Sequence, residues 1–263
     1  MISSIIRAGL ISLIIAGLIG CGSGSGSVAD GTRIDISAAP SPATSSIQNA
    51  GTKTFNNDLG DSITITRAYL VLSSATIESN CGVSFTASVE HLLSFVISNA
   101  SAHTSTTPTS TGEPYVINLL ATDDVPVNIG KLSPPVKNYC GIRIDMLAAD
   151  ADTFRLPTSA GEPDMIGKSI YIEGNFTLAG GGSGDIHLSS AAALINRDVM
   201  LASLLMVSSD NPNGLINIGI NYDTWFNAVD MSLLESETAT FTNPGDTNAG
   251  RVLQNISESI HQR

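Results

Sequence analysis

Charged and aromatic residues are scarce in this sequence, which limits the kinds of protein that it can encode. Of its 263 residues, 14% are charged and 5% are aromatic, whereas 42% are hydrophobic. The charges are also unbalanced, because 12 lysine and arginine residues stand against 24 aspartate and glutamate residues, for a formal net charge of -12. An acidic surface repels phosphate backbones, so nucleic acid is excluded as a partner. Few charges together with many serine, threonine and glycine residues are typical of exported β-proteins.

The motifs of common hydrolases and nucleotide-binding enzymes are missing as well. The sequence contains no G-x-S-x-G, no H-E-x-x-H and no P-loop. The glycine cluster at 180–184 is followed by neither a lysine nor a helical pattern, so it is interpreted as a loop. Because nothing supplies a base, a nucleophile and an orienting group together, the sequence predicts that the protein is not an enzyme.

The N-terminus has the three parts of a secretory signal. Arg7 supplies a basic start, residues 8–19 are apolar, and the small residue Gly20 precedes Cys21. A membrane-spanning helix needs about 20 apolar residues, so this run is too short to cross a bilayer. Residues 1–20 are therefore predicted to be a signal peptide.

The residues Leu18-Ile19-Gly20-Cys21 resemble the lipobox of bacterial lipoproteins. The resemblance implies cleavage before Cys21, a diacylglycerol on that cysteine, and a stable membrane anchor made of acyl chains such as palmitate. It also implies a place in the cell envelope, facing the periplasm. Gly22 stands where an aspartate would signal inner-membrane retention, which favours the outer membrane in a Gram-negative host. The alternative is an ordinary signal peptide whose cysteine is incidental.

Residues 21–55 are predicted to form a lipidated, flexible tether. Residues 22–27 alternate glycine and serine, and Pro40 and Pro42 follow in a stretch with little hydrophobic periodicity. Residues 56–263 are then expected to form a single domain, because neither an internal repeat nor a second boundary is seen.

The two cysteines that remain, Cys81 and Cys140, are an even pair in an oxidising compartment, which predicts a disulfide. Closing a loop of roughly 60 residues would stabilise the fold by about 4 kcal/mol in the chain-entropy model. A metal-thiolate pair and a redox couple are the alternatives. Both are disfavoured, because the two residues lie far apart in the sequence and neither has a second cysteine nearby.

Short alternating or apolar runs separated by turn residues predict a mainly β fold, an antiparallel β-sandwich of the immunoglobulin-like or a similar type. The predicted strands lie within residues 62–72, 82–97, 115–120, 136–146, 168–178, 185–194, 202–207 and 215–222. Residues 210–214 are expected to form a hairpin loop. Apolar residues three to four apart predict a helix over about 247–261 that packs on the β-domain. Residues 231–237 are expected to form a shorter helical turn.

Three histidines, His91, His103 and His187, are the candidate metal ligands. Neutral imidazole suits copper or zinc, and a β-sandwich can bring distant residues together, although no two of them have local ligand spacing. The alternative is three separate surface or hydrogen-bonding residues. Asp150 and Asp152 are close enough in sequence to share a cation, but a solvated loop accounts for them better.

Trp225 and Phe226 follow a predicted strand and are expected to fill the core at one end of the sandwich. The segment Trp225-Phe226-x-x-Val229-Asp230, with its following loop and helix, resembles MbnP-like, copper-associated periplasmic proteins. The resemblance covers about the last fifth of the chain. It implies a β-sandwich that acts with di-haem partners, some members of which bind copper through histidines and a modified tryptophan. No ligand motif of that family occurs in this sequence, so the resemblance assigns no ligand here.

Together these patterns predict a lipid-anchored envelope protein that acts as a non-catalytic binding or structural module and meets a protein partner through its loops. The alternative is a periplasmic carrier of copper or another metal that uses some of the three histidines.

Overall fold

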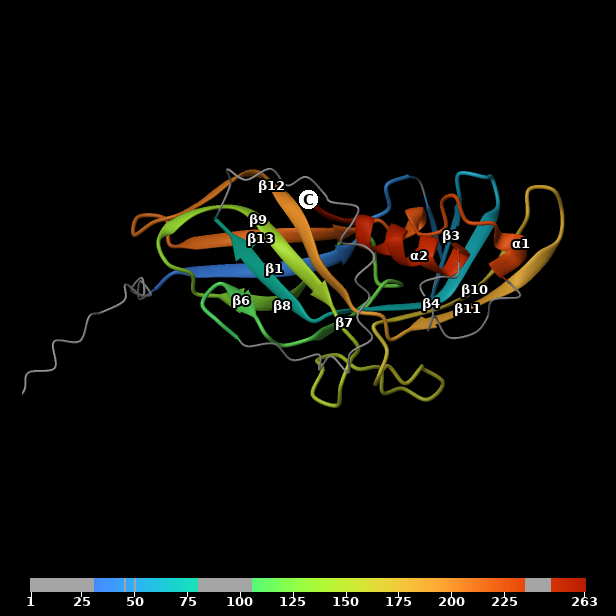
Figure 1. Ribbon diagram of the computed structural model, residues 1–263, viewed down its shortest axis with the longest axis horizontal. Helices are drawn as coiled ribbons and strands as arrows, with labels where there is room; N and C mark the ends of the chain where they lie inside the picture. The colour runs from blue at the N-terminus through green and yellow to red at the C-terminus, as the bar shows by residue number, and fades with distance from the viewer. Residues whose placement is uncertain (1–30, 45, 50, 80–105, 235–246) are drawn as a thin grey trace, which may run out of the picture.

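The computed structural model describes residues 31–44, 46–49, 51–79, 106–234 and 247–263. Within these ranges the chain forms three β-sheets, a short 3-10 helix and two α-helices (Figure 1). The predicted mainly β fold with an antiparallel sandwich is confirmed. Among the described helices, none is long and apolar enough to span a membrane.

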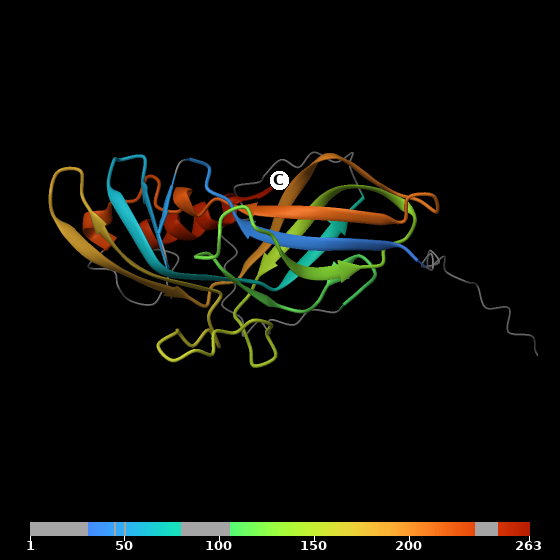
Figure 2. The same cartoon turned by 180° about the vertical axis from the view of Figure 1, so that it is seen from behind.

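Two four-stranded sheets form the sandwich at one end of the molecule (Figures 1 and 2). Sheet A consists of β14 (Ile260–Gln262), β13 (Asn213–Ile220), β1 (Arg33–Pro40) and β8 (Val127–Leu132). Sheet C consists of β12 (Leu194–Val207), β9 (Lys137–Met146), β5 (Ser74–Glu78) and β6 (Ser110–Thr111). Strand β6 lies against β8 and β12 lies against β14, so the two sheets meet at both edges.

Sheet B forms the other end of the molecule, where helices cover one of its faces (Figure 1). It consists of β11 (Ser183–Ser190), β10 (Ile170–Thr177), β4 (Ser62–Leu72), β3 (Thr52–Asn56) and β2 (Ile47–Asn49), with β7 (Tyr115–Asn118) also paired to β4. The covering segment contains the 3-10 helix η2 (Tyr222–Thr224), α1 (Met231–Leu234) and α2 (Thr247–Glu258).

The larger of two hydrophobic clusters among the described residues joins the sheets and the helical segment. It includes Ile34 from sheet A, Ile65 from sheet B, Ile144 from sheet C, and Trp225 and Ile256 from the helical segment, all at most 1% exposed. The expected core role of the tryptophan is confirmed. Burying apolar residues from both ends in one core explains why the chain forms one continuous unit.

The predicted tether over 21–55 is wrong from residue 33 onward. Strand β1 pairs in parallel with β13 and antiparallel with β8, and Ile34, Ile36 and Ala38 are fully buried. Strands β2 and β3 then form the edge of sheet B. The alternation of β1 is short, because Arg33 and Asp35 face solvent and Ile34, Ile36 and Ala38 face the core before Ala39 and Pro40 follow.

Two further expectations need correction. Residues 210–214 do not form a hairpin loop, because β12 pairs with β9 and β13 pairs with β1, so this turn carries the chain from sheet C to sheet A. The C-terminal helix ends at Glu258 rather than near 261, and β14 follows it along β13. Within the described residues, the short strands β5, β6 and β8 were also missed, whereas β4 has the predicted bounds.

Candidate binding site

His187 lies on the outer face of sheet B, away from the core. It stands opposite Glu173 of β10, which in turn stands opposite Arg67 of β4. Its side chain is 56% exposed, and its Nδ1 atom lies 3.9 Å from Oε1 of Glu173. The ring also meets the edge of Tyr171, with 5.6 Å between the ring centroids. The structure therefore gives this histidine one carboxylate neighbour and one aromatic neighbour.

The carboxylates around His187 are already engaged by other side chains. Glu173 accepts hydrogen bonds from Arg67 and from the hydroxyl of Tyr171. Glu162 accepts a 2.7 Å hydrogen bond from the hydroxyl of Tyr69, and its Oε2 atom lies 3.7 Å from Nε of Arg67. Burial alone would raise the pKa of Glu173, but the hydrogen bonds from Tyr171 and Arg67 outweigh it and hold this pKa below its ordinary value. We call Arg67, Glu173, Tyr171, Glu162 and Tyr69 the Arg67 network.

The predicted metal site stays a prediction. His91 and His103 lie outside the described residues, so their distance from His187 is not defined. In the part of the chain that the structure describes, no three histidine, cysteine, aspartate or glutamate side chains converge as metal ligands do. Oδ1 of Asp150 accepts hydrogen bonds from the amide of Asp152 and the hydroxyl of Thr153, so this carboxylate is engaged within its own loop.

The cysteine predictions also fall partly outside the described residues, which include neither Cys21 nor Cys81. Cys140 is buried in β9, with its sulfur 3.5 Å from the carbonyl oxygen of Glu78. Glu78 ends β5, and Cys81 is the third residue after it, a stretch of at most about 10 Å. The disulfide remains a prediction that peptide mapping without reduction would test.

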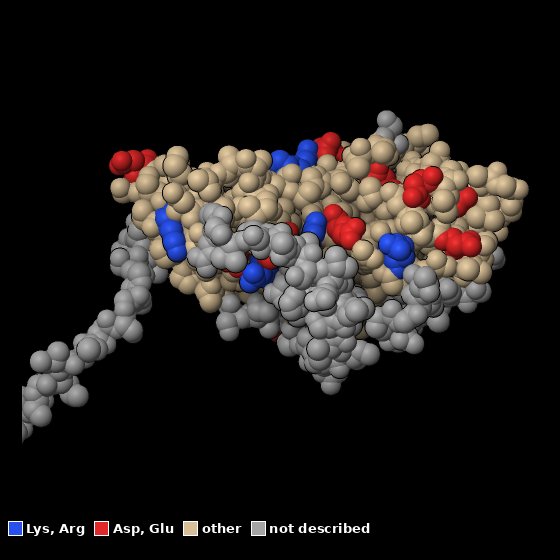
Figure 3. Space-filling view, turned by 45° about the horizontal axis from the view of Figure 1, so that its top comes forward, with Lys and Arg blue, Asp and Glu red and all other residues tan. Residues whose placement is uncertain are grey.

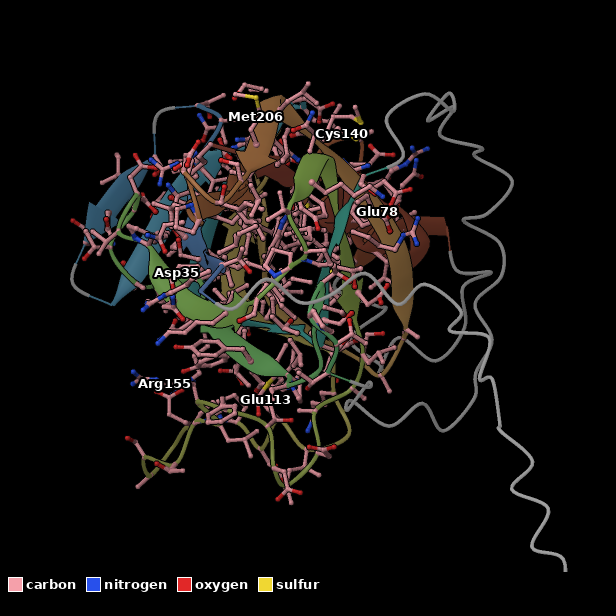
Figure 4. All side chains as sticks on the ribbon, turned by 90° about the vertical axis from the view of Figure 1, so that its left-hand side faces the viewer. Asp35, Glu78, Glu113, Cys140, Arg155 and Met206 are labelled. Carbon is pink, nitrogen blue, oxygen red and sulfur yellow. The ribbon has the colours of Figure 1, made fainter. Side chains whose placement is uncertain are left out.

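A cavity of about 520 Å³ opens beside β8, where the β6–β7 connection meets the loop that follows β9. Its lining combines charged side chains, aromatic rings and backbone. The charged and aromatic residues of this lining are Glu113, Tyr115, Lys131, Phe154 and Arg155. In Figure 4, Glu113 and Arg155 lie on the same side of the molecule. We call this feature the β8 cavity.

Backbone hydrogen bonds fix the loop that carries Phe154 and Arg155. The amide of Phe154 donates to the carbonyl oxygen of Pro114, and the carbonyl oxygen of Phe154 accepts from the amide of Val116, both at 2.9 Å. Arg155 follows in the left-handed region, with a φ of 62°, which is strained for a residue with a side chain. The fold thus holds a strained arginine and a half-exposed aromatic ring at the mouth of the cavity.

The close approach of β6 and β8 forms the floor of this cavity. A Cβ atom on Gly130 would lie 2.5 Å from Cγ2 of Thr111, so a larger residue would force the Thr111 side chain or the adjoining backbone to move. Thr111 is itself held in place, because its hydroxyl accepts a 2.9 Å hydrogen bond from the amide of Ala75. Glycine at position 130 therefore lets β8 approach Thr111 closely beside the cavity.

The charges of the cavity differ from those of the Arg67 network. Among the described side chains, none forms an ion pair with Lys131, Arg155 or Glu113. Asp35 stands opposite Lys131 across the β1–β8 pair, but it is held by Arg33, whose Nη2 atom lies 2.9 Å from Oδ1 of the carboxylate. Two cations and one carboxylate give the cavity a positive balance in a strongly acidic chain.

Sequence reasoning missed this cavity because its residues come from three separate segments. One signal was present: Phe154 and Arg155 place an aromatic residue and a cation side by side in a loop. Loops held by a rigid scaffold are common places for binding residues.

Trp225, the residue behind the resemblance to copper-associated proteins, is fully buried, and its Nε1 atom donates a 3.0 Å hydrogen bond to the hydroxyl of Ser259. Its structural surroundings are those of a core residue. Comparisons with protein-family models, curated proteins and solved structures found no match to this chain.

Proposed function

We propose that this protein is a lipid-anchored, non-catalytic binding module of the bacterial envelope that holds a small acidic ligand in the β8 cavity. The observation that carries the proposal is the pair of cations, Lys131 and Arg155, beside two aromatic rings in one open cavity. Such a mixture of apolar walls and a few oriented polar groups is typical of ligand sites.

The ligand chemistry follows from the lining. A carboxylate is the natural partner of an arginine and a lysine, because charge-assisted hydrogen bonds are the strongest ones available to these side chains. Tyr115 and Phe154 offer flat apolar surface for a ring, and Glu113 can accept bonds from hydroxyl groups. A sugar acid combines these properties, so we take it as the probe class.

The proposed anchor is lipid on Cys21. Strand β1 begins at Arg33, so residues 22–32 separate the anchor from the fold and reach at most about 40 Å when fully extended. This geometry supports a domain that stays close to its membrane. Replacement of Cys21 by serine should release the protein from membranes and stop lipid labelling, and continued anchoring would contradict the proposal.

The ligand site is tested with purified mature protein in detergent, titrated with glucuronate and with glucose. Glucuronate has a carboxylate that glucose lacks, so binding of glucuronate but not of glucose supports an acidic ligand. Arg155→Gln should weaken glucuronate binding by at least about ten-fold, since a charge-assisted hydrogen bond contributes about 1.5–3 kcal/mol. Lys137→Gln, an exposed lysine outside the cavity, is the matched control. Equal binding by both variants would exclude the β8 cavity as the site.

A copper carrier is the second candidate, favoured by the carboxylate of Glu173 beside the ring of His187. It predicts stoichiometric copper binding that falls when His91, His103 or His187 is replaced. Copper titration of the three single variants tests it, and unchanged binding in all three would reject these ligands.

A further inference from the structure

Large apolar side chains gather on the outer surface of sheet C without core neighbours to explain them. Met200, Leu204 and Met206 lie on β12, and Val136 immediately precedes β9. Their exposed fractions are 50%, 55%, 62% and 49%, in the order Met200, Leu204, Met206 and Val136. We call these four residues the β12 apolar strip. Figure 3, which turns the β12 side toward the viewer, shows few charged side chains on the left-hand part of this surface.

The strand register explains why these residues face outward together. Met206 pairs with Asn138, so Val136, two residues before Asn138, lies diagonally beside Met206 on the same face. Between Met200 and Leu205 the register shifts, because this stretch of β12 is longer than the stretch of β9 opposite it. Leu205 points inward, since a Cβ atom on Gly214 would lie 3.0 Å from its Cδ1 atom. The inward-facing residues of β12 therefore pack in the core, whereas the residues of the β12 apolar strip remain exposed.

The strip lies at the end of the fold where the N-terminal segment enters. The amide of Arg33 donates a 2.8 Å hydrogen bond to the carbonyl oxygen of Pro212, in the turn that directly follows β12. The hydroxyl of Thr32 donates a 2.7 Å hydrogen bond to the carbonyl oxygen of Pro134, close to Val136. The chain that leads back to Cys21 therefore starts beside the strip, and its length keeps this end within about 40 Å of the anchor.

We propose that the β12 apolar strip rests in the interfacial region of the phospholipid bilayer in which Cys21 is anchored. Methionine and leucine side chains on a surface held at a membrane gain from leaving water at the headgroup–acyl boundary. Figure 4 shows Met206 on the opposite side of the molecule from Glu113 and Arg155, so this orientation leaves the β8 cavity open to the periplasm.

This inference rests on the proposed lipid anchor, and native methionines provide its test. The full mature, acylated chain is labelled with 13C-methyl methionine and placed in nanodiscs of phosphatidylethanolamine and phosphatidylglycerol that contain lipids with a nitroxide near the ester groups. Methyl relaxation of Met200 and Met206 should be enhanced several-fold more than that of Met165 and Met231. Those two internal controls are buried, and Met231 lies at the sheet B end.

A paired variant sharpens the result. Leu204→Gln with Met206→Gln changes only exposed residues and should reduce the enhancement at Met200, whereas Leu59→Gln, which is equally exposed in the β3–β4 turn, should not. Enhancement at Met200 and Met206 no greater than at the controls would overturn the inference while leaving the anchor intact. A chain that does not remain with the discs would instead contradict the anchor, and the inference with it.

Discussion

Two regions of this molecule, sheet B and the β8 cavity, differ in how their charged side chains are paired. At the sheet B end, charged side chains are paired inside the protein: Arg67 and Glu173 bond one another, and Lys53 bonds Asp123. In the β8 cavity beside the sandwich, Lys131 and Arg155 lack such partners among the described residues. The comparison indicates that the paired charges of sheet B serve the fold, whereas the charges in the cavity are available to a ligand.

Lys53 is the extreme case of internal pairing. Its side chain is 1% exposed, its ammonium group bonds Asp123 Oδ1, and it lies 4.3 Å from the ring centroid of Tyr222. The hydroxyl of Tyr222 donates a 2.9 Å bond to Oδ2 of the same carboxylate. Burial lowers the pKa of Lys53, although Asp123 favours its charged form. The cluster ties β3 to the β7–β8 loop and to η2.

The largest effect is expected for Lys53→Ala. The change leaves Asp123 without its cation and opens a hole under Tyr222, so it should lower the free energy of unfolding by about 3 kcal/mol. Urea denaturation measures the loss, and Lys137→Ala, which removes an exposed lysine, should change stability by less than about 0.5 kcal/mol. Equal effects of the two changes would show that Lys53 is not part of the structural pairing.

A smaller effect is expected for Glu173→Gln, about 1 kcal/mol at neutral pH, because the hydrogen bonds of Arg67 and Tyr171 lose their charged acceptor. The folded-state pKa of Glu173 lies below the ordinary 4.5, so the unfolded chain takes up the proton first as the pH falls. The carboxylate therefore contributes stability above pH 4.5 and loses it as the pH falls through its folded-state pKa. Denaturation curves at several pH values should converge for the two proteins in acid, and a constant difference would refute this assignment.

An effect of the opposite sign is expected for Arg155→Gly. Glycine relieves the left-handed strain at this position, so stability should rise by up to about 1 kcal/mol, while glucuronate binding is lost. A thermal melt and a titration of the same sample check both halves. Loss of both stability and binding would mean that Arg155 stabilises the fold. The β8 cavity would then not differ from sheet B in the role of its charges.

The smallest effect is expected for His187→Ala. Its side chain is largely exposed, and its nearest carboxylate already has two other donors, so stability should change by less than about 0.5 kcal/mol. The same urea denaturation applies. A clearly larger loss would place this histidine inside the Arg67 network rather than at its margin.

Where the hydrophobic period was strong, sequence reasoning found the element. Strand β4 has the predicted bounds, β9 and β10 lie within one or two residues of theirs, and Val252, Leu253 and Ile256 form the buried face of α2. Strand β1 was missed because its alternation of polar and apolar residues is short, covering only residues 33–38, and is followed by Ala39 and Pro40. The β8 cavity was missed because three distant segments meet there.

The sequence by itself determined the mainly β class, the amphipathic C-terminal helix and a core tryptophan, because local periodicity and side-chain size decide these properties. It also carries the predictions of a lipid anchor at Cys21 and a disulfide between Cys81 and Cys140. Only the tertiary structure decided that β1 belongs to the core, that Glu173 is bonded by Arg67 and Tyr171, and that Lys131 and Arg155 share a cavity. These features depend on which distant strands become neighbours, and pairing between strands is set by the packing of the whole chain rather than by any one segment.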